Sequence, residues 1–310
     1  MQSRPLPQII VGFMALVAGM TYLPVDARGD IYVADFDSKT VGQYTNTGAT
    51  VNASLISGLN DPTGLAMSGS DLFVSNSADP SSANGFVGKY TTSGTTENAT
   101  LVSGLSFPNG LAISGANLFV ANTLGGTIGE YTTSGQTVNA NLVAGLSRPI
   151  ALAIDATDSN LFVSNLNSGT IGEYTTSGAV VNAALITGLG APDGLTVSGS
   201  NLFVYNSEFG TIGEYTTFGA VVNASLISGL PPGPSARLFA FGSDLFVSSS
   251  TGTISEYTTS GDLVNASLIS GLKSPSSMVV TPEPGSAALI AAAGFGLLLR
   301  RSRFKGLKDN

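Results

Sequence analysis

A unit of about 42 residues occurs six times in the middle of this chain, and this repeat limits the possible folds more than any other feature. A phrase close to EYTTSG returns at intervals of 46, 41, 43, 41 and 42 residues. Its tyrosines are Tyr44, Tyr90, Tyr131, Tyr174, Tyr215 and Tyr257. Two more phrases, close to VNASLISGL and to LFV, also recur once per unit. Four short strands and their turns fill such a length, so the period is typical of one β-propeller blade.

The second unit illustrates the strand pattern. Short apolar or alternating segments lie at 64–68, 72–75, 85–91 and 98–102. Gly and Ser separate them and supply the turn positions that tight hairpins require. Long helical patterns are absent from the repeats, so an all-β fold is expected.

The two ends of the repeat region predict how the ring closes. The first unit starts at 31–33 and lacks an innermost strand, whereas 278–280 follow Pro275 as an innermost strand without partners. Joining them completes a blade and hides a sheet edge. The sequence therefore predicts six blades of four strands over residues 28–281. An open β-solenoid is the alternative, although solenoids usually have shorter repeats.

The units resemble NHL-type propeller repeats. The family pattern P-x-G-φ-A stands here as 62–66, and the following G-x-L-φ-V-x-D/N pattern stands as 71–76. The resemblance covers about 250 residues. It implies architecture and leaves function open, because propellers host enzymes, receptors and scaffolds alike.

Composition excludes several kinds of function. The chain contains no Cys, His or Trp. Zinc fingers, haem ligation through His, iron–sulfur clusters and Ser-His-Asp triads are therefore excluded. Residues 29–281 contain five basic and 17 acidic residues, a net charge of −12. Such a body repels phosphate backbones, so no nucleic-acid partner is expected.

The N-terminus has the pattern of a signal peptide. Arg4 precedes the apolar run 9–20, and small residues flank a possible cleavage position after Ala27. The run of 12 residues is too short to cross a bilayer comfortably. We expect residues 1–27 to be a signal peptide, with a core helix as the alternative.

The C-terminus has three successive parts. Pro282, Glu283 and Pro284 are followed by the uncharged run 285–299 and by the basic tail 300–310. A helix of 15 residues spans roughly 22 Å, so it could cross a bilayer only with local thinning and snorkelling arginines. The basic tail predicts a cytoplasmic C-terminus at an inner membrane. A buried helix is the alternative.

This tail resembles the PEP-CTERM sorting signal of Gram-negative bacteria, also labelled an ice-binding protein C-terminal motif. The matching residues are Pro282, Glu283, Pro284, Arg300, Arg301 and Arg303. The resemblance implies recognition by an exosortase, anchoring in the inner membrane before processing, and delivery to the cell surface or extracellular matrix.

The loop before each innermost strand supplies one residue to the mouth of the central channel. These residues are Thr63, Asn109, Ile150, Asp193, Ala236 and Ser276. Thr63, Asn109, Asp193 and Ser276 are the candidate binding residues. Asn109 and Asp193 resemble metal-ligand positions in lactonase-type propellers, and their oxygen atoms suit Ca²⁺. Ile150 between them departs from that pattern, so no metal and no cofactor is the main expectation.

Three other polar patterns have structural interpretations. A ring after the LFV strand is expected to cap turns; it comprises Asp35, Asn76, Asn122, Asn165, Asn206 and Ser249. The glutamates of the third strands are expected to face solvent; they are Glu130, Glu173, Glu214 and Glu256. Four asparagines of the VNASLISGL phrase match N-x-S/T by accident, since Asn139 and Asn182 occupy the same position without it.

Three functions remain open. The near-identical repeats favour a non-enzymatic surface or matrix protein. A glycan- or peptide-binding module, with extracellular polysaccharide as a possible partner, is the second, and a metal-dependent lactonase-like hydrolase is the third. Aromatic residues that break the repeat would favour glycan binding, and Phe218, which replaces Ser in a turn, is expected to be exposed.

Overall fold

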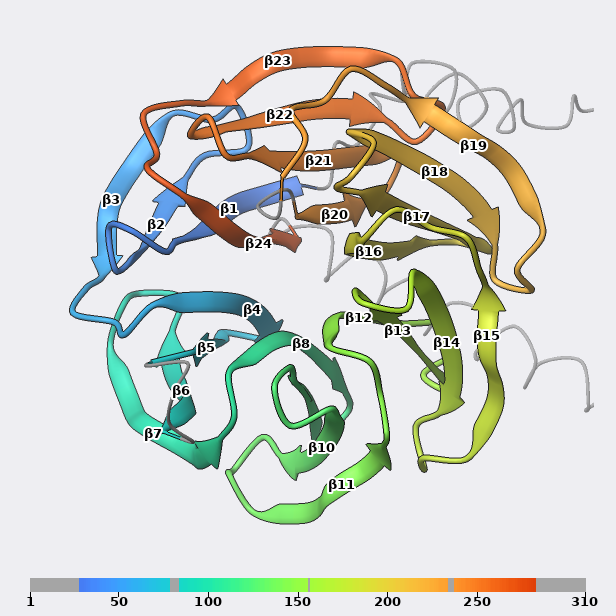
Figure 1. Ribbon diagram of the computed structural model, residues 1–310. Helices are drawn as coiled ribbons and strands as arrows, with labels where there is room; N and C mark the ends of the chain where they lie inside the picture. The colour runs from blue at the N-terminus through green and yellow to red at the C-terminus, as the bar shows by residue number, and fades with distance from the viewer. Residues whose placement is uncertain (1–27, 79–83, 156, 234–236, 283–310) are drawn as a thin grey trace, which may run out of the picture. The chain divides into compact units, whose positions relative to one another are not determined.

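Each repeat folds into one antiparallel sheet of four strands, and six such sheets surround a central axis in the computed structural model (Figure 1). The structure describes residues 28–78, 84–155, 157–233 and 237–282. They belong to one compact unit, Arg28–Pro282. The innermost strands contact one another in succession around the axis, and β20 also contacts β24. The predicted six-bladed propeller is therefore confirmed, and the open solenoid is wrong.

The strands follow the repeat units closely. The closing blade contains β24 (Pro275–Pro282), β1 (Arg28–Asp35), β2 (Thr40–Tyr44) and β3 (Thr50–Ile56). The second contains β4 (Pro62–Ser68), β5 (Asp71–Asn76), β6 (Gly85–Thr91) and β7 (Thr96–Leu105). The third contains β8 (Pro108–Ser114), β9 (Asn117–Asn122), β10 (Thr127–Thr132) and β11 (Thr137–Ala144). The fourth contains β12 (Pro149–Ile154), β13 (Asn160–Asn165), β14 (Thr170–Thr175) and β15 (Val180–Ile186). The fifth contains β16 (Pro192–Ser198), β17 (Asn201–Asn206), β18 (Thr211–Thr216) and β19 (Val221–Ile227). The sixth contains β20 (Leu238–Phe241), β21 (Asp244–Ser249), β22 (Thr253–Thr258) and β23 (Leu263–Ile269).

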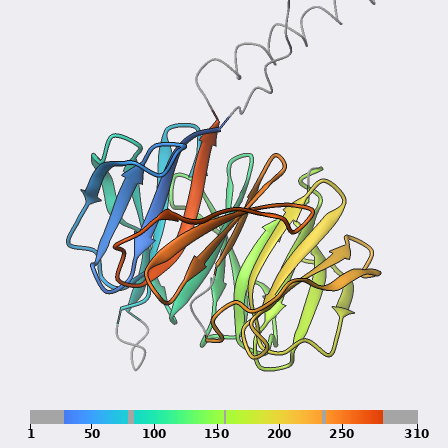
Figure 2. The ribbon, with the colours of Figure 1, turned by 90° about the horizontal axis from the view of Figure 1, so that it is seen from above.

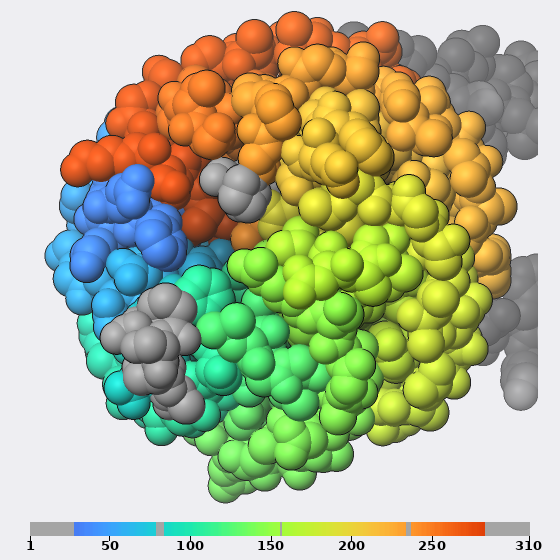
Figure 3. Space-filling model, in the orientation of Figure 1, coloured from blue at the N-terminus to red at the C-terminus, as the bar shows by residue number. Residues whose placement is uncertain are grey.

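The ring closes through β1 and β24, as the sequence predicts. These strands pair antiparallel, with Ile31 opposite Val280 and Val33 opposite Met278. In Figure 3 the blue N-terminal residues lie beside the red C-terminal residues at this seam. β24 extends to Pro282, one residue beyond the expected boundary, because Pro282 still pairs with Arg28 at the end of the ladder.

Burial changes from the axis to the rim of each blade. The second strands are almost wholly buried, which explains their continuous LFV runs; their phenylalanines Phe73, Phe119, Phe162, Phe203 and Phe246 are at most 1% exposed. The fourth strands begin with five consecutive exposed residues, as in β15. A second strand has a hydrogen-bonded strand on each side within its sheet and packs between two neighbouring blades. A fourth strand is the outer edge of its sheet and has a hydrogen-bonded strand on one side only.

The core lies between blades. Phe73 and Val87 of the second blade, for example, pack with Leu118 and Tyr131 of the third in one buried cluster. Close packing of this kind makes each blade depend on its neighbour. The glycine of the repeated G-x-Y phrase serves this packing, because a Cβ on Gly129 would lie 2.7 Å from the ring of Tyr131.

The repeated asparagine of the fourth strand has a backbone role. Asn139 Oδ1 accepts a hydrogen bond from the backbone N–H of Asn141 at 3.1 Å, next to a register shift between β10 and β11. The same bond forms in the other units, including Asn98 and Asn182. A side-chain oxygen thus satisfies an N–H at the bulge. This explains the repetition of Asn without glycosylation.

The expectation that the third-strand glutamates face solvent is wrong for three of the four. Glu130, Glu173 and Glu256 are at most 8% exposed, while Glu214 is half-buried and accepts a bond from Asn201 Nδ2 at 2.7 Å. Burial raises the pKa of Glu130, and burial together with the nearby Asp155 carboxylate raises the pKa of Glu173. Neighbouring elements cover this position, which the alternation of a single strand cannot reveal.

These glutamates predict a measurable pH dependence. A raised pKa means that the native state still holds a proton at pH values where the unfolded chain has released it. Their contribution to the free energy of unfolding therefore falls as the pH rises above about 4, the pKa of an unfolded Glu. Glu173→Gln should raise the melting temperature at pH 7, and the gain should shrink toward pH 4. Melts of the exposed Glu208→Gln variant are the control, and an equal gain in both variants would contradict the prediction.

Two predicted segments lie outside the described residues. They are the signal peptide 1–27 and the tail from Glu283 and Pro284 through 285–299 to Arg300, Arg301 and Arg303. Within the part of the chain that the structure describes, no helix is long and apolar enough to cross a bilayer.

Candidate functional site at the channel mouth

The loops that lead into the innermost strands form the mouth of the channel. In four of them the residue before the proline has a left-handed backbone: Asp61, Phe107, Arg148 and Ala191 have φ between 49° and 61°. The backbone carbonyl of each of these residues accepts a hydrogen bond from a backbone N–H just after the second strand of the same blade. For example, the N–H of Leu166 donates to the carbonyl of Arg148 at 3.1 Å. Non-glycine residues seldom adopt this conformation, and it persists only where surrounding bonds enforce it.

Two predicted mouth residues link neighbouring blades. The hydroxyl of Ser276 donates to the carbonyl of Pro62 at 2.6 Å, and the hydroxyl of Thr63 donates to that of Pro108 at 2.7 Å. Thr123, in the turn after β9, makes the corresponding bond to Pro149 at 2.8 Å. Thr63 and Ser276 thus have a structural role at the mouth.

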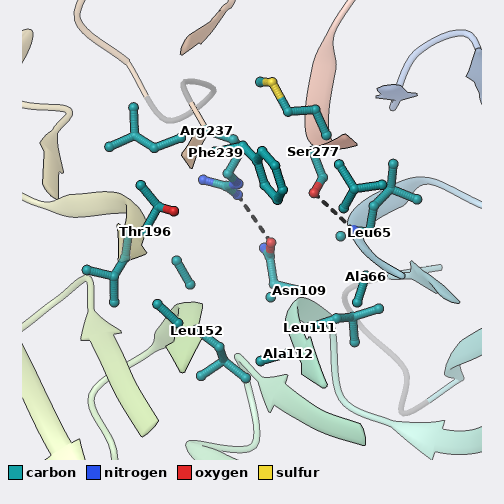
Figure 4. Close-up of a pocket in the computed structure, with 18 of the residues that line it drawn as sticks. Leu65, Ala66, Asn109, Leu111, Ala112, Leu152, Thr196, Arg237, Phe239 and Ser277 are labelled. Atoms are coloured by element: carbon teal, nitrogen blue, oxygen red, sulfur yellow. Dashed lines mark hydrogen bonds between the residues drawn. The ribbon is translucent and has the colours of Figure 1, made fainter. Parts of the chain in front are cut away.

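The other two predicted residues converge on one arginine. A guanidinium nitrogen of Arg237 donates to the Asp193 carboxylate and, at 3.0 Å, to the Asp193 carbonyl. The second nitrogen donates to Asn109 Oδ1 at 3.2 Å. Figure 4 shows Arg237 pointing across the channel toward Asn109. The ring therefore brings Asn109 and Asp193 together, but around a guanidinium.

Arg237 is not among the site residues predicted from the sequence, although the repeat contains a signal for it. At this repeat position the other units have Gly64, Gly110, Ala151, Gly194 and Ser277. A Cβ on Gly64 would lie 2.1 Å from the carbonyl of Asn109, so a small residue is required there. In the sixth blade the strand starts only at Leu238, and the long side chain extends into the channel. Ala236 lies outside the described residues.

Asp193 lies in a buried environment. It is fully buried, and its Oδ2 has no hydrogen-bond partner among the described residues. Nearby, burial and the Asp193 carboxylate raise the pKa of Tyr205. The Tyr205 hydroxyl accordingly stays protonated and donates to the carbonyl of Pro231 at 2.6 Å. Tyr205, which stands where the other units have Ala or Ser, is thus a core residue.

The residues at the mouth do not fit a calcium ion. Calcium takes six to eight oxygen ligands, several of them carboxylates. Asp193 is the carboxylate of the predicted pair, and Arg237 already neutralises it and occupies the space beside Asn109. Among the described residues, no three acidic side chains lie close enough together to hold a metal ion.

Two cavities lie along the axis. The channel has a volume of about 350 Å³, and its walls are the innermost strands with largely apolar side chains such as Leu65, Leu111 and Leu152. A second cavity of about 260 Å³, here called the mouth cavity, lies among the loops. It is lined by Phe36, Thr63, Phe107, Asn109, Arg148, Ile150, Leu166, Arg237, Ser274, Pro275 and Ser276.

The ring of polar residues after the second strands caps loops in part: the Oδ1 atoms of Asn165 and Asn206 have no hydrogen-bond partner among the described residues, whereas other members accept backbone N–H groups as predicted. Asn122 Oδ1 accepts the N–H of Ser106 at 2.7 Å, and Asn76 Oδ1 accepts that of Asn60 at 3.0 Å. Asp35 accepts the N–H groups of Lys273 and Ser274 at 2.8 and 3.0 Å. These side chains hold the loops that build the mouth.

The mouth and the ends of the propeller unit lie on opposite faces. β24 begins at the mouth cavity with Pro275 and runs through the ring to Pro282, where it pairs with Arg28 (Figure 2). Both Arg28 and Pro282 therefore lie at the face away from the mouth.

Comparisons with known proteins define the class by fold. No protein-family model and no curated protein matches the sequence. A structure of a nidogen/laminin complex superposes with a TM-score of 0.66 and 14% identity, covering 81% of this chain and 97% of that chain. Virginiamycin B lyase from Staphylococcus aureus superposes with a TM-score of 0.57 and 17% identity, covering 77% of this chain and 81% of that chain. A provisionally assigned 6-phosphogluconolactonase from Bacteroides uniformis superposes with a TM-score of 0.61 and 14% identity, covering 83% of this chain and 100% of that chain. At these identities the similarity establishes a β-propeller fold shared by binding proteins and enzymes.

Proposed function

We propose that this chain is a non-enzymatic binding propeller with its ligand site at the channel mouth. The observation that supports this most directly is the position of Arg237 between Asn109 and Asp193. These polar groups bond one another, so they form a rigid recognition surface, and the described residues of the mouth place no nucleophile beside a base. The nidogen/laminin complex provides a precedent for a propeller in a binding protein.

The enzymatic alternatives have less support from the site. A lactonase-like reaction through a metal-bound water needs an open cation position, and Arg237 occupies the candidate position. Virginiamycin B lyase, another structural neighbour, is described as catalytically inactive when one histidine is replaced by alanine. This chain contains no histidine, so it has no counterpart of that residue.

We also propose that the propeller is exported and displayed at the cell surface or in the matrix. The resemblance of residues 282–303 to an exosortase signal supports this. Fractionation of cells producing the full chain tests the idea. Retention of a chain lacking residues 282–310 in the same fraction as the full chain would contradict it.

Metal and substrate tests address the non-enzymatic proposal. Residues 28–282 contain all the strands of the ring and the six core clusters, so they are expected to fold alone. Their melts in EDTA and in excess CaCl₂ should coincide, and δ-gluconolactone should hydrolyse at the uncatalysed rate. A calcium ligand at 100 times its Kd would add about 2.7 kcal/mol, which a melt resolves. A calcium-dependent rise that Asp193→Asn abolishes would overturn the proposal.

A further inference from the structure

The loops of the mouth present different side chains from one repeated backbone. Asp61, Phe107, Arg148 and Ala191 share the left-handed conformation and the same backbone bond, whereas the strands around them are nearly identical in sequence. Scaffold-mounted loops are where binding residues usually occur. Variation at this position and at the neighbouring mouth positions, within otherwise similar repeats, points to one asymmetric recognition site at the mouth.

Two arginines line this site, and one of them is free of an ion pair with a described residue. The propeller is strongly acidic, yet Arg148 and Arg237 both line the mouth cavity and no acidic residue does so among its described lining. Arg237 is bound to Asp193 and Asn109. Arg148 is exposed and has no ion pair or side-chain hydrogen bond with another described residue. Arg148 is therefore the cation available to a ligand.

The rest of the cavity is mainly apolar. Phe36, Phe107, Ile150 and Leu166 line it beside Arg148. Its volume of about 260 Å³ is below the roughly 300–1,000 Å³ of sites for drug-sized ligands, so one ring or one side chain fits. Guanidinium groups match carboxylates through two parallel hydrogen bonds. An apolar body with a single carboxylate satisfies both parts of the lining.

We propose that the mouth cavity binds an apolar organic carboxylate, with Arg148 as the residue that pairs with the carboxylate. The inference rests on the proposed binding function and specifies its ligand chemistry. The group could belong to a small acid or to the C-terminal residue of a peptide. Arg237, fixed by Asp193 and Asn109, lines both the channel and the mouth cavity, and Asp193 neutralises its charge.

Titration calorimetry with residues 28–282 tests the proposal through 3-phenylpropionate and its amide, which differ in charge but little in shape. We expect 3-phenylpropionate to bind with a Kd on the order of millimolar, and the amide at least tenfold more weakly. Arg148→Gln should weaken carboxylate binding at least tenfold. Lys273→Gln removes the same charge from an exposed residue outside the lining and should change the Kd less than twofold. Melts of both variants establish that they fold.

Two further ligands in the same titrations distinguish a peptide C-terminus from a small acid. N-acetylphenylalanine represents a peptide C-terminus, and tighter binding of it than of 3-phenylpropionate would assign the site to peptides; the reverse would assign it to small acids. Equal binding of acid and amide, equal effects of the two variants, preference for glucuronate, or no binding would each overturn the proposal. None of these results bears on the calcium melts or lactone hydrolysis, so failure here is distinguishable from failure of the proposed function.

Discussion

A propeller that ends at Lys273, and so lacks β24, will not unfold cooperatively. The missing strand contributes Met278, Val279 and Val280, each at most 5% exposed, to two core clusters. Burial of such side chains contributes about 1.5–3 kcal/mol each. Their sum is comparable with the whole stability of a typical domain, about 5–15 kcal/mol. The truncation also leaves the edge of β1 unpaired. Circular dichroism melts of residues 28–273 measure the effect.

Residues 28–282 are the control, and they should melt in one sharp transition. A synthetic peptide of residues 274–282 should restore part of that transition when it is added to the truncated chain, because it can pair with β1. A sharp melt of residues 28–273 at the control temperature would show that the ring does not depend on this closure.

Replacing Arg28 by Ala will cost about 3–5 kcal/mol, the usual result of removing one partner of a buried ion pair. Arg28 is 5% exposed, bonds Glu256 at 2.5 Å and Asp244 at 3.2 Å, and lies 5.0 Å from the centre of the Phe246 ring. The pair joins the closing blade to the sixth blade, and the variant leaves Glu256 buried beside a cavity. Denaturant unfolding of residues 28–282 gives the difference directly.

Two further variants define the cause. Lys39→Ala breaks an exposed pair with Asp61 at 3.6 Å, and such pairs contribute at most about 1 kcal/mol. Combining Arg28→Ala with Glu256→Gln should recover part of the loss, because the unpaired buried charge disappears. Equal losses in Arg28→Ala and Lys39→Ala would refute the view that Arg28 links the two blades.

The features of this fold that depend on neighbours along the chain can be predicted from the sequence. The period, the LFV runs and the turns with Gly and Ser specify strands and blade length locally. The missing innermost strand at one end and the extra strand 278–280 at the other determine the number of blades. Phe218, predicted to be exposed from its place in a turn, is 88% exposed.

Features that depend on contacts with other parts of the ring are not predictable in this way. The alternation in β14 suggests that Glu173 faces solvent, but the structure buries it and raises its pKa. The asparagine and aspartate that resemble metal ligands are identified from sequence, yet their actual partner is not, because Arg237 lies 128 residues from Asn109.

The sequence by itself thus determined the architecture of this protein, because strand periodicity and turn chemistry are local properties repeated six times. It also identified the loops before the innermost strands as the source of the residues at the channel mouth. Only the tertiary structure decided what the residues of these loops do. Closing the ring brings Asn109 and Asp193 from separate blades to one guanidinium and leaves Arg148 open to the cavity. The physical reason is that a channel site forms from single residues of several blades, and their distances are set only when the ring closes.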